Sequence, residues 1–303
     1  MNITHPLHGL VAAAHTPFHA DGSLNLRIIE TQAAHFLRNG IKTAFIGGST
    51  GESSSLSLEE RRALALRWSE VTRGTELRMV VHVGSNCLAD ARNLAGQAEA
   101  LGATAISALT PSYFKPRSVE VLIDCCVEIA SAAAETPFYF YDIPSLTGVS
   151  LSMVEFLQRA PEKIPTLAGL KFTNPDLMTY LNCLQGGRWD IPWGIDEWML
   201  AALAMGARGF VGSSFNFAAP LYHRLIAAFE RGDLAEARTA QYRSTQFIAL
   251  LGRYGYMGAA KATMAMLGVD VGPARLPNTT LTAEQTKRLR EELEQLGFFE
   301  RTE

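Results

Sequence analysis

The stretch "TAFIGGSTGESSSLSLEERRALALRWSEVTRGTELRMVVHVG", residues 43–84, contains one complete strand–helix–strand unit. Its two ends, residues 43–48 and 77–84, are short apolar and β-branched runs of the kind found in buried strands. Between them Ser57 is followed three residues later by Glu60, the pattern of a capping box at a helix start. This order of elements predicts a right-handed parallel crossover.

The same alternation continues over the first two thirds of the chain. Candidate strands lie at residues 10–16, 43–48, 77–84, 104–110, 137–141, 166–172, 190–195 and 208–214. Each is followed by helix signals, and the units repeat at intervals of about 20–35 residues, which favours a closed barrel over an open sheet. We therefore expect an α/β protein in which residues 1–217 form a (β/α)8 TIM barrel.

Beyond residue 217 the pattern is helical only. Apolar spacing predicts helices at residues 220–232, 234–255, 257–268 and 283–297. No low-complexity linker separates them from the preceding strands. We expect residues 218–303 to form a C-terminal helical extension that packs on the barrel as one structural unit with it.

The composition restricts the class of function. The 303 residues are 48% hydrophobic and 19% charged, with a formal net charge of −3. The chain has no basic stripe for nucleic acid and no apolar run long enough to span a membrane, so we expect neither partner. The N-terminus lacks the pattern of a signal peptide, and four cysteines without a C-x-x-C pair are typical of buried, reduced thiols. A cytoplasmic location is therefore expected.

Chemistry in such a barrel takes place at the carboxyl ends of the strands. The second strand ends in "GGSTGES", residues 47–53, whose glycines allow backbone amides to face an anion, with Ser49 and Thr50 as further donors. The same letters satisfy the G-x-S-x-G pattern of serine hydrolases, which would use Ser49 with Asp196 and His223. The seven histidines form no metal-binding motif.

A lysine and a tyrosine end two neighbouring predicted strands. Lys171 lies at the end of the sixth strand and Tyr141 at the end of the fifth. A lysine in a dry barrel rim has a lowered pKa, and its neutral amine can attack a carbonyl to form an imine. A structural ion pair is the alternative role for Lys171. The lysines Lys42, Lys115, Lys163 and Lys261 are expected to be exposed and protonated.

Several motifs together resemble the superfamily of N-acetylneuraminate lyases and dihydrodipicolinate synthases, the lysine-dependent pyruvate aldolases. They are "GGSTGESSSLSLEER" (47–61), "YDIPSLTGV" (141–149), "GLKFTNPDL" (169–177), "GIDE" (194–197), "GFVGSSFN" (209–216) and "GPARLP" (272–277). The similarity extends in order from about residue 8 to near the end of the chain. The resemblance implies a (β/α)8 barrel with a C-terminal helical extension.

The resemblance also implies residue roles. Lys171 matches the lysine that forms a Schiff base with pyruvate or a 2-oxo acid, and Tyr141 matches the proton-relaying tyrosine. Ser49 and Thr50 match the pair that holds the substrate carboxylate. Tyr113 matches an aromatic position that in some relatives reaches a neighbouring subunit's site. The groups expected to line the rest of the site are Thr173, Gly194, Asp196, Glu197 and Ser213.

The branch of the superfamily is indicated by single positions. Leu146 stands where dihydrodipicolinate synthases carry an arginine for a second carboxylate, whereas "IPSLTGV", "LKFTNPDL" and "GIDE" resemble sialic acid lyases. Asp142 and Phe215 depart from residues that are frequent in relatives. The resemblance implies cleavage of N-acetylneuraminate to pyruvate and N-acetylmannosamine. Alternatives are an aldolase or dehydratase for another 2-oxo-3-deoxy sugar acid, a dihydrodipicolinate synthase-like enzyme, and a non-catalytic sugar-acid binding protein.

The expected partner is a small-molecule substrate. Because the imine on the lysine replaces a prosthetic group, we expect no cofactor and no metal. By resemblance the chain is expected to assemble as a homotetramer.

Overall fold

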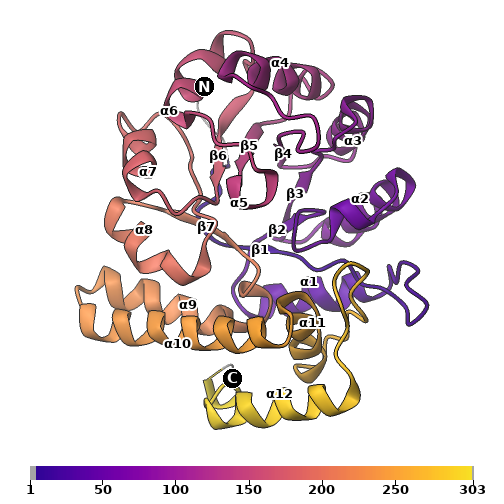
Figure 1. Ribbon diagram of the computed structural model, residues 1–303, viewed down its shortest axis with the longest axis vertical. Helices are drawn as coiled ribbons and strands as arrows, with labels where there is room; N and C mark the ends of the chain where they lie inside the picture. Colours follow the sequence, from indigo (N-terminus) through magenta and orange to yellow (C-terminus); the bar gives the residue numbers. More distant parts are fainter. Residues whose placement is uncertain (1–4, 302–303) are drawn as a thin grey trace.

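The computed structural model describes residues 5–301, and its centre is a parallel sheet curved into a barrel (Figure 1). The strands are β1 (Gly9–Ala13), β2 (Thr43–Ile46), β3 (Arg78–His82), β4 (Ala105–Leu109), β5 (Phe138–Asp142), β6 (Leu167–Phe172) and β7 (Gly209–Gly212). All strand pairs are parallel, in the order β6-β5-β4-β3-β2-β1-β7. The α/β barrel predicted from the alternation is confirmed.

The eighth predicted strand, residues 190–195, is not a regular strand. It joins β6 to β7 only through isolated bridges, which pair Trp193 with Phe172 on one side and with Phe210 on the other. Pro192 has no N–H to donate, so an uninterrupted ladder cannot form across this segment. The described barrel therefore consists of seven regular strands and one irregular segment that closes the gap.

Helices surround the barrel, one after nearly every strand (Figure 1). They are α1 (Ile28–Arg38), α2 (Leu58–Thr72), α3 (Leu88–Ala100), α4 (Val119–Ala130), α5 (Pro144–Thr147), α6 (Met153–Arg159), α7 (Leu177–Leu184) and α8 (Met199–Met205). The predicted capping box of α2 is present, with the Ser57 side chain accepting from the Glu60 amide and Glu60 accepting from the Ser57 amide. This cap fixes where the chain turns from the second strand's loop into α2.

The C-terminal third is helical, as the sequence predicts. Its helices are α9 (Phe215–Glu230), α10 (Leu234–Arg253), α11 (Tyr256–Met266) and α12 (Ala283–Gln295). They form a layer along one side of the barrel, where α9 lies against β1 and α10 (Figure 1). The predicted division of the chain at residue 217 falls inside α9.

The interior of the barrel holds its own apolar cluster, separate from the larger core between strands and helices. Tyr139 and Tyr141 of β5 both belong to this inner cluster, together with Phe45 of β2. Alternate residues of a strand point to the same side, so the interior of the barrel receives Tyr141 and, in register with it, Lys171.

Two further predictions concern single residue types and membrane spans. All four cysteines are unpaired; Cys126 and Cys183 are buried, but Cys87 is exposed, contrary to the expectation of burial, because it lies in the loop that precedes α3. Within residues 5–301 no helix has the length and apolar character needed to cross a membrane.

Candidate active site

Lys171 and Tyr141 lie side by side inside the barrel. They are register partners on β6 and β5, and the Lys171 Nζ atom is 3.4 Å from the centroid of the Tyr141 ring. The same Nζ atom is 5.1 Å from the centroid of the Phe45 ring, which reaches in from β2. Lys171 is only 4% exposed. The structure therefore brings together the two residues that strand-end position singled out.

Burial lowers the pKa of Lys171, and this effect outweighs Tyr141 and Asp196, which act in the opposite direction. Desolvation disfavours an ammonium, so near physiological pH a larger fraction of Lys171 is a neutral amine than would be the case for an exposed lysine. Among the ion pairs formed by residues 5–301, none includes Lys171, so the alternative of a structural ion pair is not supported. Chemically the group suits nucleophilic attack on a carbonyl.

The turn 47–53 follows β2 at the same end of the barrel. Gly47 has a φ of +63°, and the Glu52 amide donates to the Ser49 carbonyl to close the turn. Ser49 and Thr50 are partly buried, and Ser49 lines a cavity of about 260 Å³. The hydroxyl residues Ser49 and Thr50 and the backbone of this glycine-containing turn therefore lie at the carboxyl end of β2, and a turn of this kind suits an anion.

His82 of β3 supports this turn and was not identified from the sequence. Its Nδ1 atom is 2.9 Å from the Gly47 carbonyl, and the Arg61 guanidinium donates to the His82 carbonyl at 2.8 Å. Burial, followed by the charge of Arg61, holds the pKa of His82 well below its ordinary value. A neutral ring that donates from Nδ1 to Gly47 fits this environment.

Asp196 lies in the 3₁₀ turn η3 (Asp196–Trp198) and is buried. Its Oδ2 atom accepts from the Ser214 amide at 2.9 Å and from the Ser214 hydroxyl. Burial raises the pKa of Asp196 to about 7, the charge of Glu197 adds to this, and the Ser214 bonds and Lys171 oppose it. The carboxyl is thus held in a fixed orientation near the Lys171 amine.

Thr173 and Gly194 face each other beside this carboxyl. A methyl group placed on Gly194 would lie 2.0 Å from the Thr173 Oγ1 atom, so only glycine leaves room for that hydroxyl. The Thr173 Oγ1 atom is buried and has no hydrogen-bond partner in the described chain. Buried hydroxyls are normally paired, so Thr173 Oγ1 is a polar atom that the described chain leaves without a partner.

Ser213 and Glu197 lie in different surroundings from each other. The Ser213 hydroxyl is 2.8 Å from the Tyr256 hydroxyl, which α11 brings to the site. Glu197 is partly exposed and lines another cavity, of about 470 Å³, together with Trp198 and Leu234. The predicted acidic pair is therefore divided between a buried carboxyl and one at the surface.

Tyr113 lies apart from the other predicted residues. It is 80% exposed and stacks edge-to-face on the equally exposed Phe114 at 5.0 Å between ring centroids. Within one chain it belongs to the surface and not to the barrel interior.

The serine hydrolase arrangement is absent. The side-chain hydrogen bonds of Asp196 go to Ser214, while the Nε2 atom of His223 is 2.9 Å from the carbonyl of Asn39, the C-cap of α1. Since acid and base do not meet, Ser49 has no activating base of the predicted kind.

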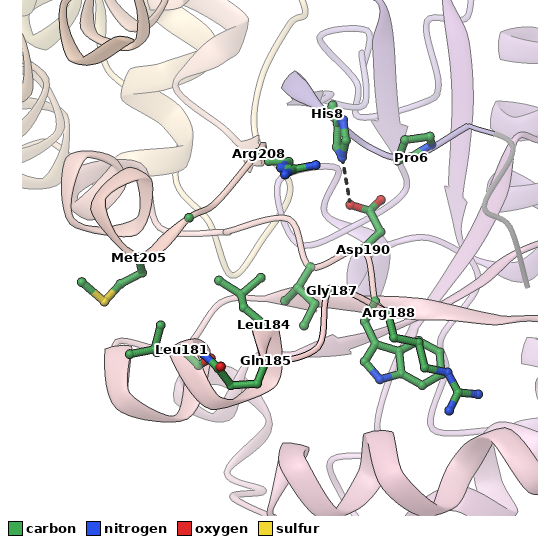
Figure 2. Close-up of a pocket in the computed structure, with 13 residues that line it drawn as sticks. Pro6, His8, Leu181, Leu184, Gln185, Gly187, Arg188, Asp190, Met205 and Arg208 are labelled. Carbon is green, nitrogen blue, oxygen red and sulfur yellow. Dashed lines mark hydrogen bonds and ion pairs between the residues drawn. The ribbon is translucent and has the colours of Figure 1, made fainter. Parts of the chain in front are cut away.

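A separate cavity of about 510 Å³ lies at the opposite, amino end of the barrel (Figure 2). Asp190 lines it and accepts from the Tyr139 hydroxyl at 2.7 Å and from the Leu7 amide at 2.6 Å. His8 also faces this carboxylate, at 3.9 Å. None of the predicted site residues lines this cavity, so it is distinct from the Lys171 site.

The expectation about the other lysines is wrong at one position. Lys42, Lys115 and Lys163 are exposed, as predicted, but Lys261 is 1% exposed and forms an ion pair with Glu52. Its partner is distant in sequence, so a local reading of the chain around Lys261 gave no sign of burial.

Comparison with known proteins finds a matching family and several similar enzymes. Residues 6–296 match the model of the dihydrodipicolinate synthetase family. An N-acetylneuraminate lyase of Mus musculus is 37% identical over 298 residues, 96% of this chain and 93% of the relative. The solved N-acetylneuraminate lyase of Proteus mirabilis is 40% identical with a TM-score of 0.94, and the match covers 97% of this chain and 100% of that one. A catalytic lysine mutant of Ruminococcus gnavus sialic acid aldolase is 25% identical with a TM-score of 0.90, over 96% of both chains.

Proposed function

The chain belongs to the dihydrodipicolinate synthetase family, and from this premise we propose that it cleaves N-acetylneuraminate reversibly to pyruvate and N-acetylmannosamine. It is a carbon–carbon lyase of the aldolase type. The observation that carries the proposal is the buried Lys171 amine, 3.4 Å from the centroid of the Tyr141 ring and without an ion-pair partner among residues 5–301.

In this mechanism the Lys171 amine attacks the C2 carbonyl of the open-chain sugar acid, and loss of water gives an imine. Removal of the C4 hydroxyl proton then allows the C3–C4 bond to break, because its electron pair moves into the protonated imine to form an enamine. Tyr141 carries this proton, either as the base or as a relay to the substrate carboxylate. Protonation of the enamine at C3 and hydrolysis of the imine release pyruvate and restore the amine.

Different groups around Lys171 are proposed to bind different parts of the substrate. Ser49 and Thr50 are proposed to hold its carboxylate. Asp196, Thr173 and Ser213 are proposed to bind its hydroxylated chain, since a polyol offers several O–H donors that need acceptors when water is excluded. The unpaired Thr173 hydroxyl supports such a contact.

Leu146 distinguishes this function from that of a dihydrodipicolinate synthase. The residue is 65% exposed and carries no charge, so it offers no clamp for a second carboxylate. Glu197 and Gly194 are proposed to shape the sugar end of the site.

Other properties follow from the same proposal. The amine itself supplies the electron sink, so we propose that the enzyme needs no cofactor. We also propose a homotetramer in which the exposed Tyr113 and Phe114 are covered by a second copy. Four unpaired cysteines are compatible with the reducing cytoplasm as its compartment.

Trapping with borohydride tests the proposal. Incubation with pyruvate and borohydride should add one pyruvate-derived mass to the peptide containing "GLKFTNPDL", residues 169–177, and activity should fall in step. Pyruvate release should then be assayed over a panel of 2-oxo-3-deoxy sugar acids, with N-acetylneuraminate expected to be preferred. Modification of a different lysine would contradict the assignment of Lys171, and sugar-acid binding without turnover would favour a binding protein.

A further inference from the structure

A single non-glycine residue of the described chain, Glu52, has a positive φ, and it lies at the end of the turn proposed to hold the carboxylate. Its φ is +54° and its ψ is +36°. A residue with a side chain is disfavoured in this left-handed region and persists there only when its surroundings hold it. Glu52 follows Thr50 by two residues, so the contacts that hold Glu52 also restrain the backbone of the turn that carries Ser49 and Thr50.

The side chain of Glu52 is held by an ion pair with Lys261 of α11. Its Oε1 atom is 2.7 Å from the Lys261 Nζ atom, and the two side chains are 0% and 1% exposed. The other carboxylate oxygen accepts from the Arg275 amide at 2.8 Å and from the Asn278 side chain at 3.2 Å. All of these partners come from the C-terminal extension.

The same lysine also connects to the turn through a second route. Lys261 donates to the Thr16 carbonyl at 2.9 Å and to the Pro273 carbonyl at 2.8 Å, so its ammonium group faces three acceptors. The Thr16 hydroxyl in turn donates to the Gly51 carbonyl at 2.6 Å. Both Gly51 and Glu52, the two residues that follow Thr50, are therefore fastened to the Lys261 cluster.

The electrostatics of the pair also suit an anion site. A buried ion pair is weak evidence for stability, because desolvation offsets most of the attraction, and its better-supported use is to specify one geometry. Here Lys261 neutralises a carboxylate that would otherwise stand two residues from Thr50 and repel an anionic substrate. Buried His15 is close enough to this cluster that, after burial itself, the charge of Lys261 lowers the pKa of His15.

We propose that Glu52 and Lys261 are positioning residues for the substrate carboxylate, whose ion pair fixes the turn 47–53 from the C-terminal extension. The inference rests on the proposed function, because it assigns the turn to a 2-oxo acid. It gives residues 218–303 a part in substrate binding, although none of them performs the chemistry at Lys171.

The test separates binding from chemistry and from stability. Borohydride trapping on Lys171 is measured against pyruvate concentration for the unmodified protein, Glu52→Gln and Lys261→Met. Tyr139→Phe is the matched control, since it removes a hydrogen bond to another buried carboxylate, Asp190, at the opposite end of the barrel. Thermal unfolding is recorded for all four proteins. If Lys261→Met yields no folded protein, Glu52→Gln carries the test, because the amide keeps the shape and one acceptor oxygen.

We expect both variants to raise the half-saturating pyruvate concentration by about tenfold or more, the loss typical of a misplaced hydrogen bond to a charged group. Trapping at saturating pyruvate should still modify Lys171 alone, and Tyr139→Phe should lower the unfolding temperature without changing half-saturation. Half-saturation within about twofold of the unmodified protein in the folded variants would show the pair to be purely structural. Absence of trapping in the unmodified protein would instead overturn the proposed function, and this inference with it.

Discussion

Two lysines of this protein are buried to a similar degree but in very different surroundings. Lys171 faces the rings of Tyr141 and Phe45 inside the barrel, whereas Lys261 lies beneath the turn 47–53 with a carboxylate at 2.7 Å. For both, burial is the largest influence and lowers the pKa. For Lys261 the opposing influence is the ion pair with Glu52, and two carbonyls accept its remaining hydrogens.

The difference teaches that burial alone does not make a lysine a nucleophile. An ammonium with a carboxylate and two carbonyls has every donor satisfied, and deprotonating it would leave Glu52 as an unpaired buried charge. Lys171 faces two aromatic rings, and no carboxylate of the described chain is within ion-pair distance of it, so its deprotonation breaks no ion pair. We therefore expect Lys171 to react with the substrate and Lys261 to position the turn 47–53. The following changes test that contrast.

The largest effect is expected for Lys171→Ala. Removing the nucleophile should abolish trapping and reduce turnover by a factor on the order of 10⁴–10⁶, as removal of a catalytic nucleophile does elsewhere. Mass spectrometry after borohydride treatment and a pyruvate-release assay measure the two losses. Lys163→Ala, which removes an exposed lysine paired with Asp124, should behave like the unmodified protein. Trapping on Lys261 in the Lys171→Ala protein would break the comparison between the two sites.

The next effect in size is expected for Tyr141→Phe. The ring and its packing against Lys171 remain, so pyruvate should still be trapped, but cleavage should slow by roughly 10²–10⁴ because the phenol no longer carries the proton. Comparing single-turnover cleavage with the trapping rate separates these two steps. An unchanged cleavage rate would remove the Tyr141 hydroxyl from the mechanism.

These contrasts also show what the sequence can and cannot predict. Lys171 and Tyr141 were predicted as neighbours because both end β-strands in the parallel repeat, and strand ends of a barrel meet at one rim. Lys261 was misjudged because its burial depends on Glu52, which only the packing of α11 under the turn 47–53 brings near. Local pattern carries no information about such a contact.

The same limit applies to the supporting residues. Ser214 and Tyr256 contribute hydroxyls to Asp196 and Ser213, and a serine or tyrosine in a helical or loop pattern has no distinguishing signal. The segment 190–195 was predicted as a strand from its apolar letters, but Pro192 interrupts its ladder. Element type was therefore predictable from periodicity, while closure of the barrel and hydrogen-bond partners depended on tertiary packing.

The smallest effect is expected for Asp196, a buried carboxyl near the site that can be compared with the two buried lysines. Asp196 has no cationic partner of its own, and burial raises its pKa from 3.8 to about 7. Because the folded pKa lies above the unfolded one, stability is lost as pH rises from about 4, where the unfolded carboxyl ionises, to about 7, where the folded one ionises, and the loss stays constant above about pH 7. Asp196→Asn should therefore raise the unfolding temperature at about pH 8.5, by roughly 2–4 °C for each kcal/mol relieved, and should change it little below about pH 4.

The stabilised variant should bind its substrate less well. The ionised carboxylate offers more acceptor capacity to a polyol than an amide does, so we expect Asp196→Asn to weaken sugar-acid binding while leaving pyruvate trapping on Lys171 intact. Asp124→Asn, which removes an exposed carboxylate in an ion pair with Lys163, is the control and should change the unfolding temperature and sugar-acid binding little. Equal unfolding temperatures of Asp196→Asn and the unmodified protein across this pH range would mean that Asp196 is ionised at no cost. In that case a nearby charge would compensate Asp196, as Lys261 compensates Glu52. The distinction between reactive buried groups, such as Lys171, and ion-paired ones would then not hold.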